Sequence, residues 1–167
     1  MKTKHFKKYR LVKVIACCLI VVTLTKCAST AKLSDFPPSS ANIDFDKYSK
    51  EFTASKTPFW TSKSSNEYYF EAPFKSSEDY LMVAIKHGLN SNDYSIRSAS
   101  MENKCVIAER GMRANEWSSI TGVYYHFEGG VAKIYIKTKI TQDITGGWRE
   151  NRAMKVGKEI EKNIQGK

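Results

Sequence analysis

The sequence predicts an α+β domain of two layers, in which one antiparallel sheet packs against two helices in the order β-α-β-β-β-β-α. Three observations predict it. Two stretches carry apolar residues at helical spacing, four strand-like runs lie between them, and the last two runs are joined by Gly129–Gly130. The domain covers residues 66–167, about 100 residues, which is enough for one modest core.

The first strand and both helices follow from composition and spacing. Residues 67–74 are rich in aromatics and end near Pro73, which is typical of an edge strand. Ser76 and Asp79 form a capping box for the first helix. Its apolar stripe is Leu81, Ala84, Ile85 and Gly88. A final helix over about 151–164 has the stripe Ala153, Val156, Gly157, Ile160 and Ile164.

The four remaining strands are expected at 94–100, 105–110, 120–128 and 131–141. The Gly-Gly loop also fixes the register of the last hairpin, because both glycines accept φ > 0. One face then carries the pairs Phe127–Ala132, Tyr125–Ile134 and Val123–Ile136, and the other carries His126–Lys133, Tyr124–Tyr135 and Gly122–Lys137. The first face is apolar on both strands, as a sheet buried on one face requires.

Residues 1–26 have the pattern of an export signal. A basic opening without acids precedes the apolar run Val14–Thr25, which at 12 residues is shorter than the roughly 20 residues of a membrane span. Seven of the 27 basic residues and none of the 17 acidic ones lie in 1–26, which leaves a net charge of +3 for the rest. The high overall charge is therefore no reason to expect a nucleic-acid partner.

The stretch LTKCAST, Leu24–Thr30, resembles the lipobox of bacterial lipoproteins. The resemblance implies cleavage before Cys27, diacylation (palmitate-type chains) of its sulfur, and anchoring to a membrane facing the periplasm. Lys26 departs from the pattern, which has a small residue there. Two alternatives stay open: ordinary cleavage after Ala31, which releases a soluble periplasmic protein, and an uncleaved anchor.

The element order over about 66–164 resembles the helix-grip-like domains of small bacterial envelope lipoproteins, including accessory lipoproteins of outer-membrane assembly. This resemblance is one of element order alone, so it implies a fold and carries no functional residues to this chain.

Residues 27–65 have the composition of a linker or tether. Ser, Thr, Lys and Asp dominate, and Pro37, Pro38 and Pro58 interrupt any regular period. Aromatic residues nevertheless recur in it: Phe36, Phe45, Tyr48, Phe52, Phe59 and Trp60. The segment either drapes over its own domain and buries these rings, or orders on contact with a partner.

Two sets of residues are candidate binding sites. The polar face of the hairpin interleaves basic and aromatic side chains suited to an anionic surface or an envelope protein partner, unless it is simply a solvated sheet face. It comprises Tyr124, His126, Lys133, Tyr135, Lys137 and Lys139. The loop 141–151 offers an anion site before a helix, with Gly146, Gly147, Arg149 and Arg152, or else is a tight connection.

The sequence contains no recognised hydrolase, P-loop or zinc motif, and only His87 and His126 remain after export. A Cys105–His126 dyad is disfavoured because the register turns His126 outward; Cys105 fits a small buried residue. We expect no enzyme, cofactor or metal, and a membrane-tethered accessory module that acts by contact. The alternative is a periplasmic binder of a small amphipathic ligand between helix and sheet, which a cavity there would favour.

Overall fold

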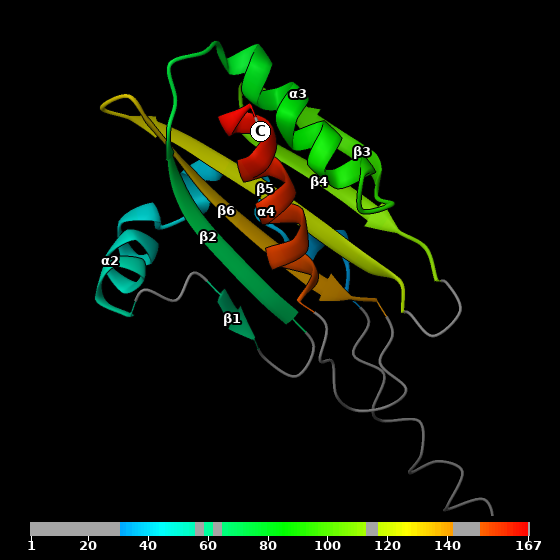
Figure 1. The fold of residues 1–167 in the computed structure, drawn as a ribbon. Coiled ribbons are helices and arrows are strands. Elements are labelled where there is room, and N and C mark those ends of the chain that lie inside the picture. Colours follow the sequence, from blue (N-terminus) through cyan, green and yellow to red (C-terminus); the bar gives the residue numbers. More distant parts are fainter. Residues whose placement is uncertain (1–30, 56–58, 62–64, 113–116, 142–150, 167) are drawn as a thin grey trace, which may run out of the picture.

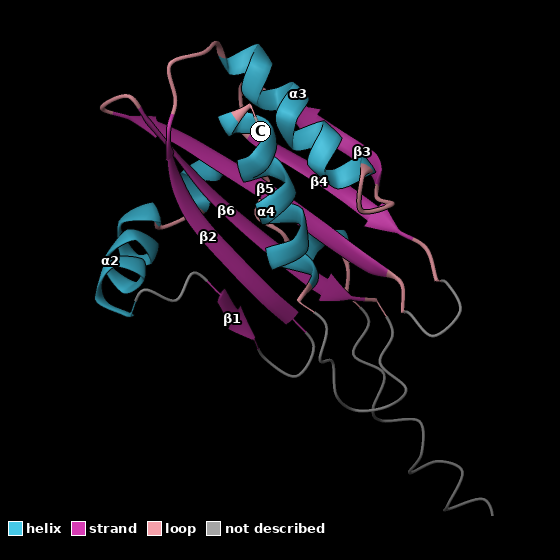
Figure 2. Ribbon diagram, viewed as in Figure 1, coloured by secondary structure: helices cyan, strands magenta, loops and turns pink. Residues whose placement is uncertain are grey.

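The structure, a computed structural model, describes residues 31–55, 59–61, 65–112, 117–141 and 151–166. Within these residues it is an α+β fold with one antiparallel sheet in the order β1-β2-β6-β5-β4-β3 (Figure 1). The strands are β1 (Phe59–Thr61), β2 (Ser65–Pro73), β3 (Ser95–Ser100), β4 (Cys105–Arg110), β5 (Ser119–Glu128) and β6 (Val131–Ile140). The helices are α2 (Phe45–Ser55), α3 (Glu78–Asn90) and α4 (Arg152–Gln165), with 3-10 turns η1 (Leu33–Asp35) and η2 (Ser40–Asn42). Figure 2 separates helices from strands by colour.

The predicted fold class and the predicted order from residue 65 onward are confirmed. The hairpin register is confirmed as well. Tyr125 lies opposite Ile134 and Tyr124 lies opposite Tyr135. Gly129 and Gly130 both take positive φ, at 59° and 80°, which is the conformation that the register argument needed.

Helices α3 and α4 cover one face of the sheet (Figure 1), and their predicted stripes face the core. Helix α3, the first of the two predicted helices, begins one residue later than expected, because Ser77 rather than Ser76 accepts the hydrogen bond from the Tyr80 N–H. The helices pack tightly on each other and on the sheet. A Cβ added to Gly88 would lie 2.5 Å from Ile160 Cγ1, and one added to Gly157 would lie 2.2 Å from Tyr68 Cδ1.

The opposite face of the sheet is covered by residues 31–55, which we call the strap. It contains η1, η2 and α2, and its blue and cyan ribbon passes behind the strands in Figure 1. Phe36 and Phe45 of the strap are buried against Tyr69, Tyr124 and Tyr135 of the sheet. The predicted boundary at residue 65 is therefore misplaced, because part of the presumed linker belongs to the fold. The interpretation in which the segment drapes over its own domain describes these residues.

Strand β2 is not the edge strand that its proline suggested. It lies between β6 and the short strand β1, which pairs with it only from Asn66 to Tyr68. The proline itself is exposed at the end of the strand and pairs with Val131 beside the hairpin. Pro73 thus ends the strand at a place where its missing N–H costs little.

Candidate functional site

The polar hairpin face identified from sequence lies beneath the strap. The expectation that it is open is wrong for its two rings: Tyr124 and Tyr135 are 0% and 2% exposed. Tyr48 of α2 packs on Tyr135, with 4.3 Å between the ring centroids. The physical reason is that the strap aromatics, which sequence analysis assigned to a linker, find a matching aromatic surface on this face.

Tyrosine hydroxyl groups between this face and the strap donate hydrogen bonds to carboxylates or backbone carbonyls. Tyr48 Oη donates to Glu67 at 3.0 Å, and Tyr69 Oη donates to Glu71 at 2.6 Å. Tyr124 Oη donates to the Pro37 carbonyl at 2.9 Å. Burial raises the pKa of Tyr48 to about 12, and burial likewise raises the pKa of Tyr69. Tyr48 and Tyr124 therefore act as neutral donors that join the strap to the sheet. Tyr69 donates within β2 to Glu71, which also accepts a hydrogen bond from Ser49 of the strap at 2.6 Å.

The lysines of this face are partly engaged with acids of the strap and hairpin. Lys133 contacts Glu128 and Asp46, and its side chain is only 13% exposed. Its hydrogen bond to Glu128 lowers the pKa of that carboxyl. Lys139 lies 3.2 Å from Asp35. Lys137 lines a depression of about 280 Å³ together with strap residues. The positive charge expected on this face is thus partly offset by acids of the strap and of the hairpin.

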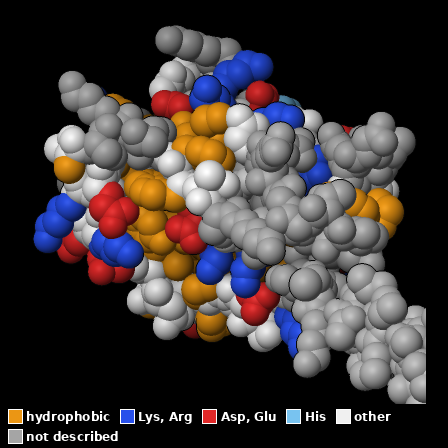
Figure 3. All heavy atoms as spheres, turned by 90° about the horizontal axis from the view of Figure 1, so that it is seen from below, with side chains coloured by type: hydrophobic (Ala, Val, Ile, Leu, Met, Phe, Trp, Pro, Cys, Tyr) orange, Lys and Arg blue, Asp and Glu red, His pale blue; other side chains and the backbone are white. Residues whose placement is uncertain are grey.

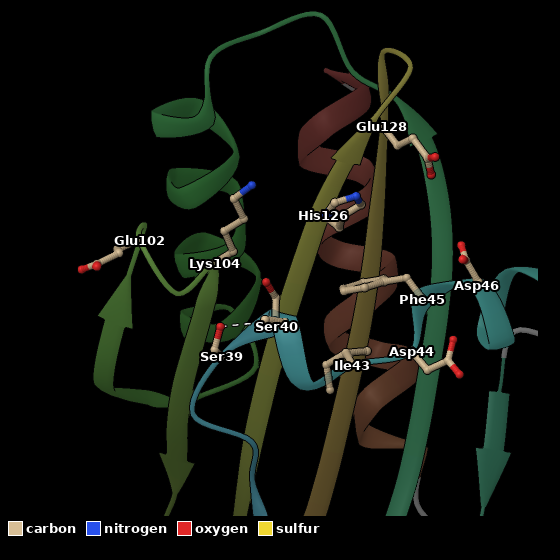
Figure 4. A pocket seen from close by; sticks show the side chains of 11 residues that line it. Ser39, Ser40, Ile43, Asp44, Phe45, Asp46, Glu102, Lys104, His126 and Glu128 are labelled. Carbon is tan, nitrogen blue, oxygen red and sulfur yellow. Dashed lines mark hydrogen bonds between the residues drawn. The ribbon is translucent and has the colours of Figure 1, made fainter.

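A larger groove opens where the strap crosses the hairpin end of the sheet (Figure 4). We call it the acidic groove. It has a volume of about 510 Å³, and four acids line it against one lysine and one histidine. Its ionisable residues are Asp44, Asp46, Glu102, Lys104, His126 and Glu128. The His126 ring lies against Phe45, with centroids 5.7 Å apart, so it forms part of the wall.

The acids of this groove were not among the predicted site residues, although a signal was present. Asp44 accepts a hydrogen bond from the Lys47 N–H at 2.9 Å, which is the contact of a helix N-cap. Phe45, Tyr48 and Phe52 follow at i, i+3 and i+7, the spacing of an apolar helical stripe. Asp44 is an N-cap residue type, and with the stripe that follows it predicts α2 from the sequence. Asp44 and Asp46 then line the same groove as His126.

Cys105 is buried, and its thiol donates to the Pro38 carbonyl at 3.3 Å. Burial raises the pKa of this thiol, which disfavours the thiolate that a nucleophile needs. Cys105 does not line the groove that contains His126. Among the described residues, no group of three or more His, Cys, Asp and Glu side chains is arranged to hold a metal ion.

The anion-binding loop falls largely outside the described residues, and this includes Gly146, Gly147 and Arg149. Arg152 is described, and it is wrong as a surface ligand because it is 2% exposed. Its Nη1 donates to the Trp117 carbonyl at 2.5 Å and to Ser119 Oγ at 2.8 Å. The guanidinium joins the start of α4 to the start of β5. Cys27 also lies outside the described residues.

Comparison with known proteins gives no family. No protein-family model matches the chain, and no curated protein matches it. Among solved structures, the chain is similar to CalU16 from Micromonospora echinospora at 9% identity, with 61% of this chain and 86% of that chain covered and a TM-score of 0.37. Within the described residues, no helix has the length and apolar character needed to cross a membrane.

Proposed function

We propose that this protein is a non-catalytic interaction module of the bacterial envelope, tethered to a membrane by a lipid on Cys27 and facing the periplasm. The proposal that the protein acts by contact is supported mainly by the way in which the sheet is covered. Both faces of the sheet are covered by the protein itself, one by α3 and α4 and the other by the strap. The grooves that the described residues form lie at the surface, where another macromolecule can make contact.

The alternative function, a binder of a small amphipathic ligand between helix and sheet, has less support. Val123, Tyr125, Ile134 and Ile136 are all fully buried under the helices. The close approaches at Gly88 and Gly157 leave no space there for even one added carbon without movement. A ligand in this layer would have to displace core side chains, which costs several kcal/mol.

Ala31 bears on how the signal is removed. Its N–H donates to the Ile140 carbonyl at 3.3 Å, and its side chain packs at the margin of the strap cluster. Cleavage after Ala31 would discard this contact, whereas cleavage before Cys27 keeps it. The contact therefore supports the lipoprotein pathway over the release of a soluble periplasmic protein.

The tether is tested with Cys27→Ala in cells supplied with a labelled fatty acid. We expect the variant to lose the label and to leave the membrane fraction. Lys26→Gly is the matched control, because it improves the lipobox and should speed processing. A mature chain that begins at Lys32, read by mass spectrometry, would contradict the lipid anchor.

The contact role is tested by photo-crosslinking in cells. A photoreactive residue at Lys104, inside the acidic groove, should give a discrete adduct with an envelope protein. The same residue at Val83, which is 63% exposed on α3, is the control and should give none. Adducts of equal yield at both positions, or at neither, would argue against the groove as the contact surface.

A further inference from the structure

Two grooves of opposite charge lie at opposite ends of the strap-covered face. The acidic groove is at the Gly129–Gly130 end. A second groove of about 450 Å³, which we call the basic groove, lies at the end where Ser119 pairs with Ile140. Its ionisable lining residues are Lys32, Arg97, Glu109 and Arg110, three basic and one acidic. Arg97 pairs with Glu109 at 2.6 Å and Arg110 lies 4.0 Å from Asp93, so acids offset much of the arginine charge in this groove. The ten residues of β5 separate the two ends by about 31 Å.

The described chain begins at the basic end. The Ala31 N–H is hydrogen-bonded to Ile140, the last residue of β6, and Lys32 and Leu33 line the basic groove. Cys27 precedes Ala31 by four residues, which span at most about 14 Å. A lipid at Cys27 therefore holds the basic end beside the bilayer. The acidic groove would face away from it.

Exposed apolar side chains accompany the basic groove. Leu33 is 54% exposed, and Met112, next to the lining residue Gly111, is 59% exposed. Figure 3 views the molecule from below and shows hydrophobic, basic and acidic side chains side by side on the described surface. Apolar side chains partition into the headgroup region, and adjacent basic groups meet the anionic lipids of a bilayer.

We infer that the basic groove, with Leu33 and Met112 at its rim, is the surface by which the protein lies on an anionic phospholipid bilayer. The lipid then limits how far the protein can lie from the bilayer, and this surface sets its orientation. The acidic groove is left at the far end of β5, about 31 Å along the strand, where partners can reach it. The inference rests on the proposed function, because it takes the membrane tether at Cys27 as given.

Orientation is measured on the full chain, acylated in cells, purified, and reconstituted into phosphatidylethanolamine–phosphatidylglycerol vesicles. A fluorescent label is attached at Met112→Cys or Met101→Cys in a Cys105→Ser background, and brominated lipids quench it. The two methionines flank opposite ends of β4, and Met101, at 40% exposure, is the matched control. We expect quenching of the label at 112 and none at 101.

The contribution of basic side chains to membrane binding is measured by the partitioning of the same acylated chain onto vesicles. Lys32→Gln should weaken partitioning about fivefold on anionic vesicles, since one basic residue near such a surface contributes about 1 kcal/mol. Lys75→Gln is the control. Lys75 is exposed near the hairpin end, where the Phe74 N–H donates to the Gly130 carbonyl, so partitioning should not change.

The outcomes separate the two proposals. Vesicle association with equal quenching at 101 and 112, or no loss for Lys32→Gln, overturns the orientation and leaves the tether standing. A chain that carries no lipid and binds no vesicles overturns both.

Discussion

The two faces of the sheet are covered in different ways. On the helix side the sheet contributes mainly aliphatic side chains, such as Val106, Val123 and Ile134, to a core closed by α3 and α4. On the strap side the sheet contributes three buried tyrosines together with smaller side chains. Two contacts between sheet and strap are hydroxyl hydrogen bonds, and a third is the hydrogen bond from the Cys105 thiol to the Pro38 carbonyl. A short strap cannot supply the apolar area of two helices, and rings with polar ends give it both area and fixed partners.

The largest effect is expected on the helix side. Ile134→Asp buries a carboxylate without a partner and should cost more than about 4 kcal/mol, which is enough to unfold a domain of this size. Urea unfolding followed by circular dichroism measures it. Ile134→Val, the matched control, should cost about 1 kcal/mol. A cooperative transition at the wild-type midpoint for Ile134→Asp would contradict the assignment of this face.

The helix side was predictable because each of its signals is local. The Gly-Gly loop fixed which residues of β5 and β6 lie opposite each other, and the alternation of apolar residues then selected the inner face. Helix stripes in α3 and α4 needed only their own spacing. Both sets of inferences use residues that are close in the chain.

The strap side was predicted poorly because its contacts join distant residues. Tyr48 packs on Tyr135, and the Cys105 thiol binds the Pro38 carbonyl, so neither partner is visible from its own neighbourhood. The prolines and polar residues of 31–55 resemble a linker in composition. Draping of the segment over its own domain was one of the two interpretations, but its composition did not indicate that it covers the candidate face, and the acidic groove was therefore not predicted.

A medium effect is expected on the strap side. Tyr48→Ala removes a ring that contacts Tyr135, Trp60 and Tyr69, and should cost about 3 kcal/mol. Near-ultraviolet circular dichroism and urea unfolding measure the loss. Lys50→Ala, an exposed position on the same helix, is the control and should change stability by less than about 0.5 kcal/mol. Equal effects of the two variants would mean that α2 does not dock on the sheet.

The smallest effect is a loss of folding stability at alkaline pH, and it compares the two faces most directly. Tyr48 on the strap side and Tyr68 on the helix side each have a pKa that burial raises to about 12. In the unfolded chain a tyrosine ionises near pH 10. Their contribution to stability is therefore complete below about pH 10 and is lost as the pH rises toward about 12, because the unfolded state releases its protons first.

Phenylalanine at either position removes this dependence without removing the ring. At neutral pH, Tyr48→Phe should cost about 1 kcal/mol, since it loses the hydrogen bond to Glu67. Above about pH 10 the deficit should shrink, because the wild type is penalised by ionisation in its unfolded state and the variant is not. Tyr68→Phe should show the same relative gain at high pH. Urea midpoints measured from pH 7 upward test both, and a deficit that stays constant for Tyr48→Phe would mean that this hydroxyl is open to solvent and that the strap is not closed over it.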